Sequence, residues 1–187
     1  MKLVVGLCNG IFAKTSRHSI GAHLVGQLAS KLGLHWELYP SLLAYVVQGC
    51  SVILVWPLSA YNSSGYVVER CARRFHVKHC DVCVVHDDIE IKAGDIRHKV
   101  GGSCRGNKGL QSCEQNLDPD FERIRIGVGP RPKERDRMTI FSFVLASVPE
   151  ADLVKISAMW SKCPFVAGIL QSEHGERDSQ GQSLHSS

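Results

Sequence analysis

The sequence contains no apolar segment long enough to cross a membrane, and no Arg-rich or secretory segment precedes its first structured residues. Its opening residues, MKLVVGL, already have the composition of a buried strand. We therefore expect the protein to act in the cytoplasm without a membrane partner. A mitochondrial pool is the alternative location.

A disulfide framework and a metal site are not indicated either. A chain of 187 residues buries enough apolar surface to fold as one domain without covalent staples, so its eight cysteines are expected to be reduced. Cys80 and Cys83 form a single CxxC with no second pair nearby, whereas a structural zinc site needs four ligands. We expect no metal, and we expect Cys83 to face the core from a strand.

Neither sign of charge is in large excess. Lys and Arg number 22 against 18 Asp and Glu, which gives a net charge of +4 and a pI of about 8.6. This mild basicity permits an anionic partner and does not by itself identify one.

Short apolar runs and amphipathic segments alternate along most of the chain. Strands are predicted at 2–7, 42–47, 51–55, 82–85 and 123–128, and helices at 20–32, 65–75, 108–117 and 150–163. The short spacing between the second and third strands fits a hairpin. The pattern predicts an α/β fold: a single domain over residues 1–165, with a twisted, mixed and mostly parallel sheet flanked by helices.

Two segments show no such pattern. Residues 138–149 are expected to be a connection. From residue 171 the tail QSEHGERDSQGQSLHSS loses almost all apolar residues, so it cannot offset the entropy of ordering, and we predict that it is disordered.

Candidate chemistry gathers where the fourth predicted strand ends. His86-Asp87-Asp88 follows that strand, and the Gly-rich run GGSCRGNKG follows at 101–109. Sheets of α/β enzymes place their sites at such strand ends. The Gly-rich run lacks the Ser or Thr that would follow the lysine of a phosphate-binding loop, so no nucleotide cofactor is expected. A serine esterase using Ser64 or Ser103 is the alternative, although no GxSxG motif is present.

Three separated motifs together resemble those of the bacterial-type peptidyl-tRNA hydrolases, in the same order. They are TSRHSIG at 15–21, WPLSAYNSSG at 56–65 and the run VVHDDIEIKAGDIRHKVGGSCRGNKGL at 84–110. The resemblance covers residues 1–165 and is nearest to metazoan members of the family, whose tails also resemble this one. It implies a monomeric enzyme without a cofactor, which hydrolyses the ester between peptide and tRNA.

The resemblance also assigns roles to individual residues. His18 would be the general base that activates water, and Asp87 the carboxylate that supports its imidazole; near pH 7 an unperturbed imidazole is able to accept a proton. The residues implied in substrate binding are Asn9, Phe12, Asn62, Asn107 and Lys108. Those implied in holding tRNA phosphate are Lys99, Arg105 and Arg131. For Asn62 alone, a helix cap is a strong alternative role, because Asn is a favoured N-cap residue.

Some positions depart from the family pattern. Lys108 stands where the family has an Asn that contacts substrate, Gly10 replaces a proline, and Ala60 replaces an aromatic residue. These departures motivate a second hypothesis, a tRNA-binding protein that kept the fold and lost turnover. The expected partner in either case is peptidyl-tRNA, with stalled ribosome complexes as a further candidate.

Overall fold

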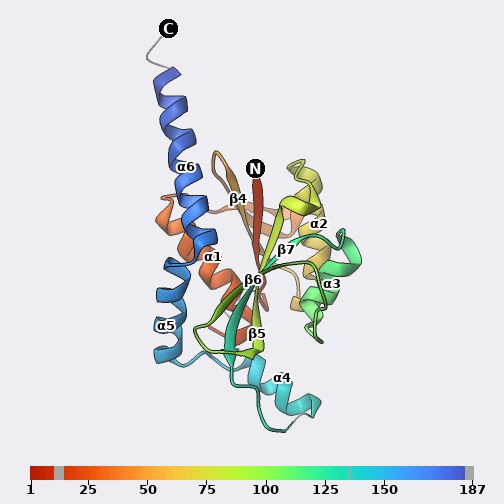
Figure 1. The fold of residues 1–187 in the computed structure, drawn as a ribbon. Coiled ribbons are helices and arrows are strands. Elements are labelled where there is room, and N and C mark those ends of the chain that lie inside the picture. Colours follow the sequence, from red (N-terminus) through yellow and green to blue (C-terminus); the bar gives the residue numbers. More distant parts are fainter. Residues whose placement is uncertain (11–14, 135, 184–187) are drawn as a thin grey trace.

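The computed structural model describes residues 1–10, 15–134 and 136–183, with side chains as far as residue 177. Within these residues, seven strands form one twisted sheet with helices on both faces (Figure 1). In spatial order the strands are β2 (Glu37–Tyr39), β3 (Ala44–Gln48), β4 (Val52–Pro57), β1 (Lys2–Gly6), β5 (Val82–Lys92), β7 (Glu122–Gly129) and β6 (Ile96–Val100). The predicted single-domain α/β fold is confirmed.

The centre of the sheet is parallel and its margins are antiparallel. Strand β1 pairs in parallel with β4 and β5, and β5 pairs in parallel with β7. Strands β2, β3 and β6 each run antiparallel to their neighbours, and β3 with β4 forms the predicted hairpin. The apolar runs of the central strands are buried because helices cover both of their faces.

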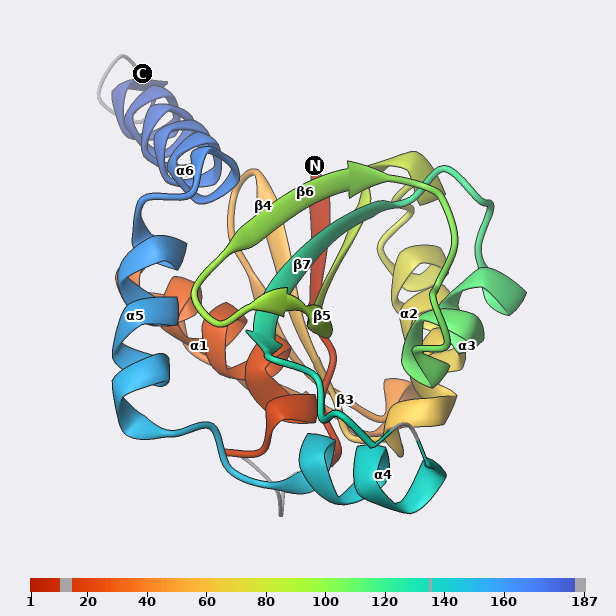
Figure 2. The same cartoon turned by 60° about the horizontal axis from the view of Figure 1, so that its bottom comes forward.

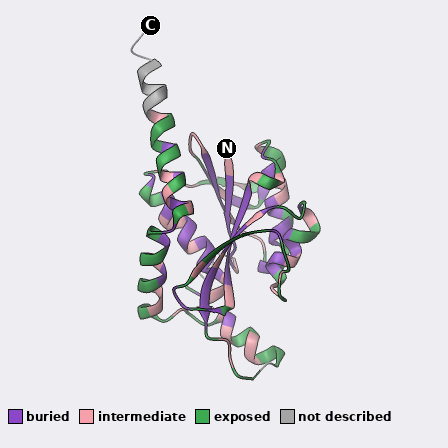
Figure 3. Cartoon of the chain, in the orientation of Figure 1, coloured by how far each residue is buried: buried purple, intermediate pink, exposed green. Residues whose placement is uncertain are grey.

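The helices cover the two faces in separate groups (Figure 2). One group is α1 (Ile20–Lys31), α5 (Glu150–Ser161) and α6 (Pro164–Ser183), and the other is α2 (Ser64–Arg74) and α3 (Lys108–Asn116). Each group closes one buried apolar cluster against the sheet, and the outward surfaces of α5 and α6 are exposed (Figure 3). No single described helix is long and apolar enough to cross a membrane; only α5 and α6 taken together, bent by 52°, reach that length and composition.

The segment predicted to be a connection contains a helix, α4 (Arg137–Leu145). Its first turn is capped by Asp136, whose carboxylate accepts a hydrogen bond from the Thr139 N–H at 2.9 Å. The periodicity argument missed this helix because it has no buried apolar stripe: Val144 is its one buried residue. The prediction for this segment was wrong.

The tail from residue 171 was predicted to be disordered, whereas α6 continues through it to Ser183. Glu173 anchors the helix. Its buried carboxylate accepts hydrogen bonds from the N–H groups of Cys50 at 2.6 Å and Ser51 at 2.8 Å, in the turn between β3 and β4. Apolar composition could not reveal this anchor, because the contact is made by one charged side chain.

The chain topology creates a natural site at the carboxyl end of β1, which lies beside Val85 in the middle of β5. Strands β4 and β5 lie on opposite sides of β1, and ligand sites of α/β sheets form where connections diverge beyond such a strand end. Gly21 lets α1 begin close against this part of the sheet, because a Cβ at this position would clash with the carbonyl oxygen of Val85. The turn that precedes α1 is thereby held beside the middle of β5.

Candidate active site

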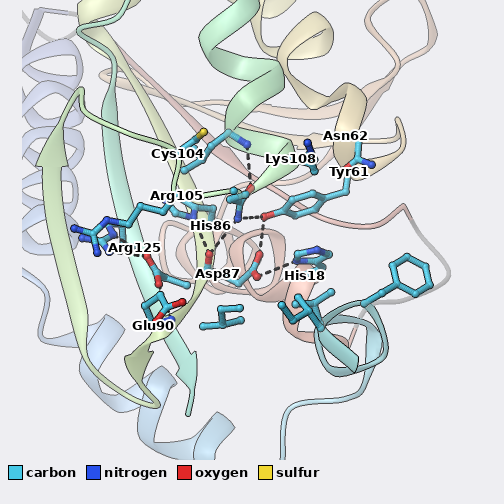
Figure 4. A pocket seen from close by; sticks show the side chains of 18 of the residues that line it. His18, Tyr61, Asn62, His86, Asp87, Glu90, Cys104, Arg105, Lys108 and Arg125 are labelled. Carbon is cyan, nitrogen blue, oxygen red and sulfur yellow. Dashed lines mark hydrogen bonds and ion pairs between the residues drawn. The ribbon is translucent and has the colours of Figure 1, made fainter. Parts of the chain in front are cut away.

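A cavity of about 470 Å³ opens at this edge of the sheet, between the start of α3 and α4 (Figure 4). Residues predicted for the site line its walls: Asn9, His18, Asn62, Asp87, Lys99, Arg105, Asn107, Lys108 and Arg131. The remaining predicted residue, Phe12, lies outside the described residues. The fold therefore brings these scattered positions to one place, while their individual roles stay predictions.

His18 and Asp87 form a hydrogen-bonded pair in this cavity. His18 Nδ1 lies 2.9 Å from Asp87 Oδ2, and the His18 side chain is 21% exposed whereas that of Asp87 is 2% exposed. An ionised carboxylate can only accept hydrogen bonds, so Nδ1 carries the proton and Nε2 keeps a free lone pair. This is the tautomer that a general base requires.

Asp87 stays ionised in spite of its burial. Burial by itself raises the pKa of Asp87, but His18, the Tyr61 hydroxyl and His86 together bring it below the ordinary value. His86 is buried, burial lowers its pKa, and its Nδ1–H donates to the Asp87 carbonyl oxygen at 2.8 Å. His86 is thus a support within β5, which continues to Lys92 instead of ending before His86 as predicted.

Tyr61 completes the cluster, and the sequence analysis did not single it out. Its hydroxyl lies 2.6 Å from Asp87 Oδ1, and its ring stacks on the His18 imidazole with centroids 3.9 Å apart and an interplanar angle of 13°. The only sequence signal for Tyr61 is its position next to Asn62.

Asn107 bonds to the same cluster. Its Nδ2 donates to the Tyr61 hydroxyl at 2.9 Å, and its Oδ1 caps α3 by accepting from the Leu110 N–H at 3.0 Å. Both the nitrogen and the oxygen of the Asn107 amide are therefore already hydrogen-bonded within the protein. These are the atoms that the predicted contact of Asn107 with substrate would use.

Asn62 faces the cavity and is not the helix cap. It is exposed in the 3₁₀ turn η3 (Tyr61–Ser63), and the residue that precedes α2 is Ser63. The alternative role as N-cap was therefore wrong. Asn9 also lines the cavity, in the turn that follows β1, and the Asn9 N–H donates to Ser19 Oγ at 3.2 Å.

The two serines of the alternative esterase hypothesis lack a base. Ser64 is buried and its hydroxyl donates to the Tyr61 carbonyl oxygen at 2.8 Å. Ser103 Oγ accepts from the Arg105 N–H at 3.2 Å. In neither case is the serine bonded to an imidazole, so the geometry does not support a serine nucleophile.

The basic side chains of the cavity fall into two sets. Those held by carboxylates are Arg123 with Glu114, Arg125 with Asp88, and Arg131 with Glu90. Lys99, Arg105, Lys108 and Arg137 are exposed, and none of them forms an ion pair with a carboxylate in the described part of the chain. The second set is the one free to meet an anion.

Helix α4 supplies an apolar wall that the sequence analysis did not anticipate. Ile140, Phe141, Val144 and Leu145 face the cavity from this helix. An apolar wall beside a few placed polar groups is typical of small-molecule sites.

Metal ligands do not gather in the described ranges, since no group of three or more His, Cys, Asp or Glu side chains there is arranged to hold an ion. Cys83 is buried in β5, as predicted, while Cys80 is exposed. The two thiols of the CxxC therefore lie in different environments.

A sheet with a parallel centre and a hydrogen-bonded His–Asp pair in a cavity beside it is typical of α/β enzymes that use general acid–base catalysis. A family model described as peptidyl-tRNA hydrolase matches residues 3–183 of this chain. The chain therefore belongs to the peptidyl-tRNA hydrolase family, as the sequence motifs implied.

Individual relatives agree with this membership. The peptidyl-tRNA hydrolase of Mycobacterium leprae is 37% identical over 175 residues, which cover 90% of this chain and 86% of that protein. The one from Pseudothermotoga lettingae is 32% identical over 177 residues, covering 92% and 91%. The crystal structure of peptidyl-tRNA hydrolase from Acinetobacter baumannii is 27% identical and superposes with a TM-score of 0.81, covering 94% of this chain and 93% of that one.

Proposed function

We propose that this protein hydrolyses the ester bond between a peptide and its tRNA, with His18 as general base and Asp87 as its partner. The observation that carries the proposal is the 2.9 Å pair of His18 and Asp87, which lines a cavity with free cations. Family membership supplies the substrate. The unit proposed to hold the activity is residues 1–165, because every residue that lines the cavity precedes Ala146.

The proposed reaction begins with a water molecule beside His18 Nε2. This nitrogen accepts a proton as the water oxygen attacks the ester carbonyl carbon, and Asp87 stabilises the imidazolium that forms. The amide of Asn62 donates to the developing oxyanion. The ester bond then breaks, the imidazolium returns its proton to the leaving ribose oxygen, and the products are a peptide carboxylate and free tRNA.

Binding is assigned to the outer part of the cavity. Lys99 and Arg105 hold tRNA phosphate, joined by Arg131, which shares its charge with Glu90. Asn9 recognises the acylated amino group, because an amide pairs with a peptide group and not with a free ammonium. The substrate is proposed to be met in the cytoplasm, with stalled ribosomes as one source. The SQGQSL segment at 179–184 supports a relation to metazoan members.

A direct assay tests the proposal. Purified protein is incubated with N-acetyl-aminoacyl-tRNA and, in parallel, with the unblocked aminoacyl-tRNA, and the released amino acid is measured. We expect rapid release from the blocked substrate only, and no inhibition by a serine-directed phosphonate. Binding of tRNA without turnover would replace the proposal with the binding-protein hypothesis, which the departures at Lys108, Gly10 and Ala60 motivated.

A further inference from the structure

Tyr61 is placed between the two proposed catalytic residues and touches both of them. Its ring stacks on His18, and its hydroxyl lies 2.6 Å from the Asp87 carboxylate. The residue is 3% exposed, so water does not compete for these contacts. The ring is further confined by α3, because a Cβ on Gly109 would lie 2.5 Å from Tyr61 Cε1.

The direction of each hydrogen bond in this cluster follows from the end of α3. Asn107 Oδ1 accepts from the Leu110 N–H, so the amide nitrogen is the atom that faces Tyr61. An amide nitrogen only donates, and the Tyr61 oxygen therefore accepts from it and donates its own proton elsewhere. The acceptor at 2.6 Å is Asp87 Oδ1.

The result is a series of hydrogen bonds with one direction, which runs from the α3 cap residue Asn107 to the Asp87 carboxylate beside His18. The protons point from Asn107 to Tyr61 and from Tyr61 to Asp87, while Asp87 accepts the Nδ1–H of His18 with its other oxygen.

We propose that Tyr61 is a positioning residue for hydrolysis, which holds Asp87 in the orientation that sets the His18 tautomer, with Asn107 directing the Tyr61 proton. This inference rests on the proposed function and deepens it. Tyr61 itself exchanges no proton with the substrate. Its hydroxyl donates a hydrogen bond that stabilises the negative charge of Asp87, and its ring limits the tilt of the His18 imidazole.

The test compares Tyr61→Phe, which removes the hydroxyl and keeps the ring, with Tyr66→Phe as the matched control. Tyr66 is exposed on α2, and its hydroxyl accepts a hydrogen bond from Arg70. We expect Tyr61→Phe to lower kcat roughly tenfold or more, as for loss of a hydrogen bond to a charged group, with KM within about twofold. Tyr66→Phe should match the wild type. Equal kcat in the two variants would overturn the proposal.

The pH profile separates positioning from a merely structural role. The titratable groups that face Asp87 are His18, Tyr61 and His86, and the Tyr61 hydroxyl is one of the groups that lower the pKa of Asp87. Without this hydroxyl the Asp87 carboxylate keeps more of its charge for the Nδ1–H of His18 and favours the imidazolium, so the acid limb of kcat should move to higher pH in Tyr61→Phe. An unmoved acid limb together with a lower melting temperature would assign Tyr61 to stability alone.

Asn107→Ser tests the direction of the chain, since serine still caps α3 but does not reach Tyr61. We expect kcat to fall in this variant. We expect Tyr61→Phe/Asn107→Ser to be no more than about twofold slower than Tyr61→Phe, because the 2.9 Å bond from Asn107 to the Tyr61 hydroxyl is shorter than its 3.4 Å contact with the Asp87 carbonyl oxygen and carries the effect. If the kcat losses of the two single variants multiply in the double variant, Asn107 does not act through Tyr61.

A second measurement is independent of turnover. The Nδ1–H proton of His18, hydrogen-bonded to Asp87, is expected to give a downfield NMR signal that shifts in Tyr61→Phe and not in Tyr66→Phe. A wild-type protein without turnover would defeat the proposed function, and the signal would then decide the positioning role by itself. An identical signal in wild type and Tyr61→Phe would overturn that role.

Discussion

The guanidinium of Arg17 lies 4.0 Å from the centre of the Phe143 ring and donates through Nη1 to the Phe143 carbonyl oxygen at 3.1 Å. The same Nη1 lies 3.2 Å from the Ser147 carbonyl oxygen, and the Arg17 N–H donates to the Ala146 carbonyl oxygen at 3.1 Å. A helix ends in unpaired carbonyls with partial negative charge, which a cation stabilises. The residue next to His18 therefore holds the cavity wall formed by α4.

Arg17→Ala should loosen this wall. We expect the free energy of unfolding to fall by about 2 kcal/mol, from loss of charged hydrogen bonds and the ring contact, and amide exchange across α4 to speed up. Arg17→Lys is the matched variant, because it keeps the charge without the planar fork and should lose only part of the effect. Unchanged exchange in α4 would show that the contact does not hold the helix.

Asp87→Asn should reduce turnover far more than binding. The amide cannot stabilise an imidazolium and favours the wrong tautomer of His18, so we expect kcat to fall at least about a hundredfold with little change in tRNA affinity. Asp120→Asn, at an exposed residue outside the cavity, serves as control. A variant that lost only affinity would remove Asp87 from the proposed pair.

Glu173 should make the docking of α6 sensitive to acid. Burial raises its pKa, but the Ser51 and Cys50 N–H groups and the Ser51 hydroxyl bring it below the ordinary value. Its stabilising effect is therefore complete above the unfolded pKa of about 4.3 and is lost as pH falls through the lower folded value.

Glu173→Ala is expected to destabilise the protein by about 2 kcal/mol near neutral pH, because two half-buried N–H groups lose a charged acceptor. Gly49→Ala should also destabilise, since a Cβ there would clash with the Glu173 carboxylate. Denaturant titrations between pH 3 and 7 measure both effects, and parallel curves for wild type and Glu173→Ala over that range would contradict the anchor.

Elements with strong periodicity could be predicted from the sequence, and elements held by single contacts could not. The central strands and α1 bury continuous apolar runs or stripes, so their positions were predicted to within a few residues, although β5 runs on well beyond the predicted strand. Strand β6 is exposed or half-exposed along its length, and β2 has three residues, so neither has an alternating pattern to detect.

The site shows the same division. His18, Asp87 and Asn62 could be located because their neighbours form recognisable motifs. Tyr61 was missed because its role depends on the approach of three segments, η3, β5 and the start of α3, which no local pattern encodes. The alternative role of Asn62 as a helix cap was wrong because Asn and Ser both favour the N-cap position. Local propensity therefore could not decide which of Asn62 and Ser63 precedes α2.

Lys108→Asn tests whether the largest motif departure has become a phosphate contact. Lys108 is exposed at the start of α3 and lines the cavity. We expect the variant to bind tRNA more weakly, with the slope of log K against log salt shallower by roughly 0.7 to 0.9. Lys162→Asn, beyond the end of α5, should leave the slope unchanged. A rise in turnover from near zero in Lys108→Asn would instead mean that the lysine blocks the site.

The most direct test of the account is the single-turnover rate of N-acetyl-aminoacyl-tRNA hydrolysis in His18→Ala, compared with wild type and with His35→Ala, a change at an exposed histidine outside the cavity. Loss of the general base should slow His18→Ala at least about a hundredfold while tRNA affinity and the melting temperature stay close to those of the wild type. His35→Ala should hydrolyse the substrate at the wild-type rate. A folded His18→Ala protein that retains activity within a few-fold of wild type would contradict the central claim that His18 activates the water.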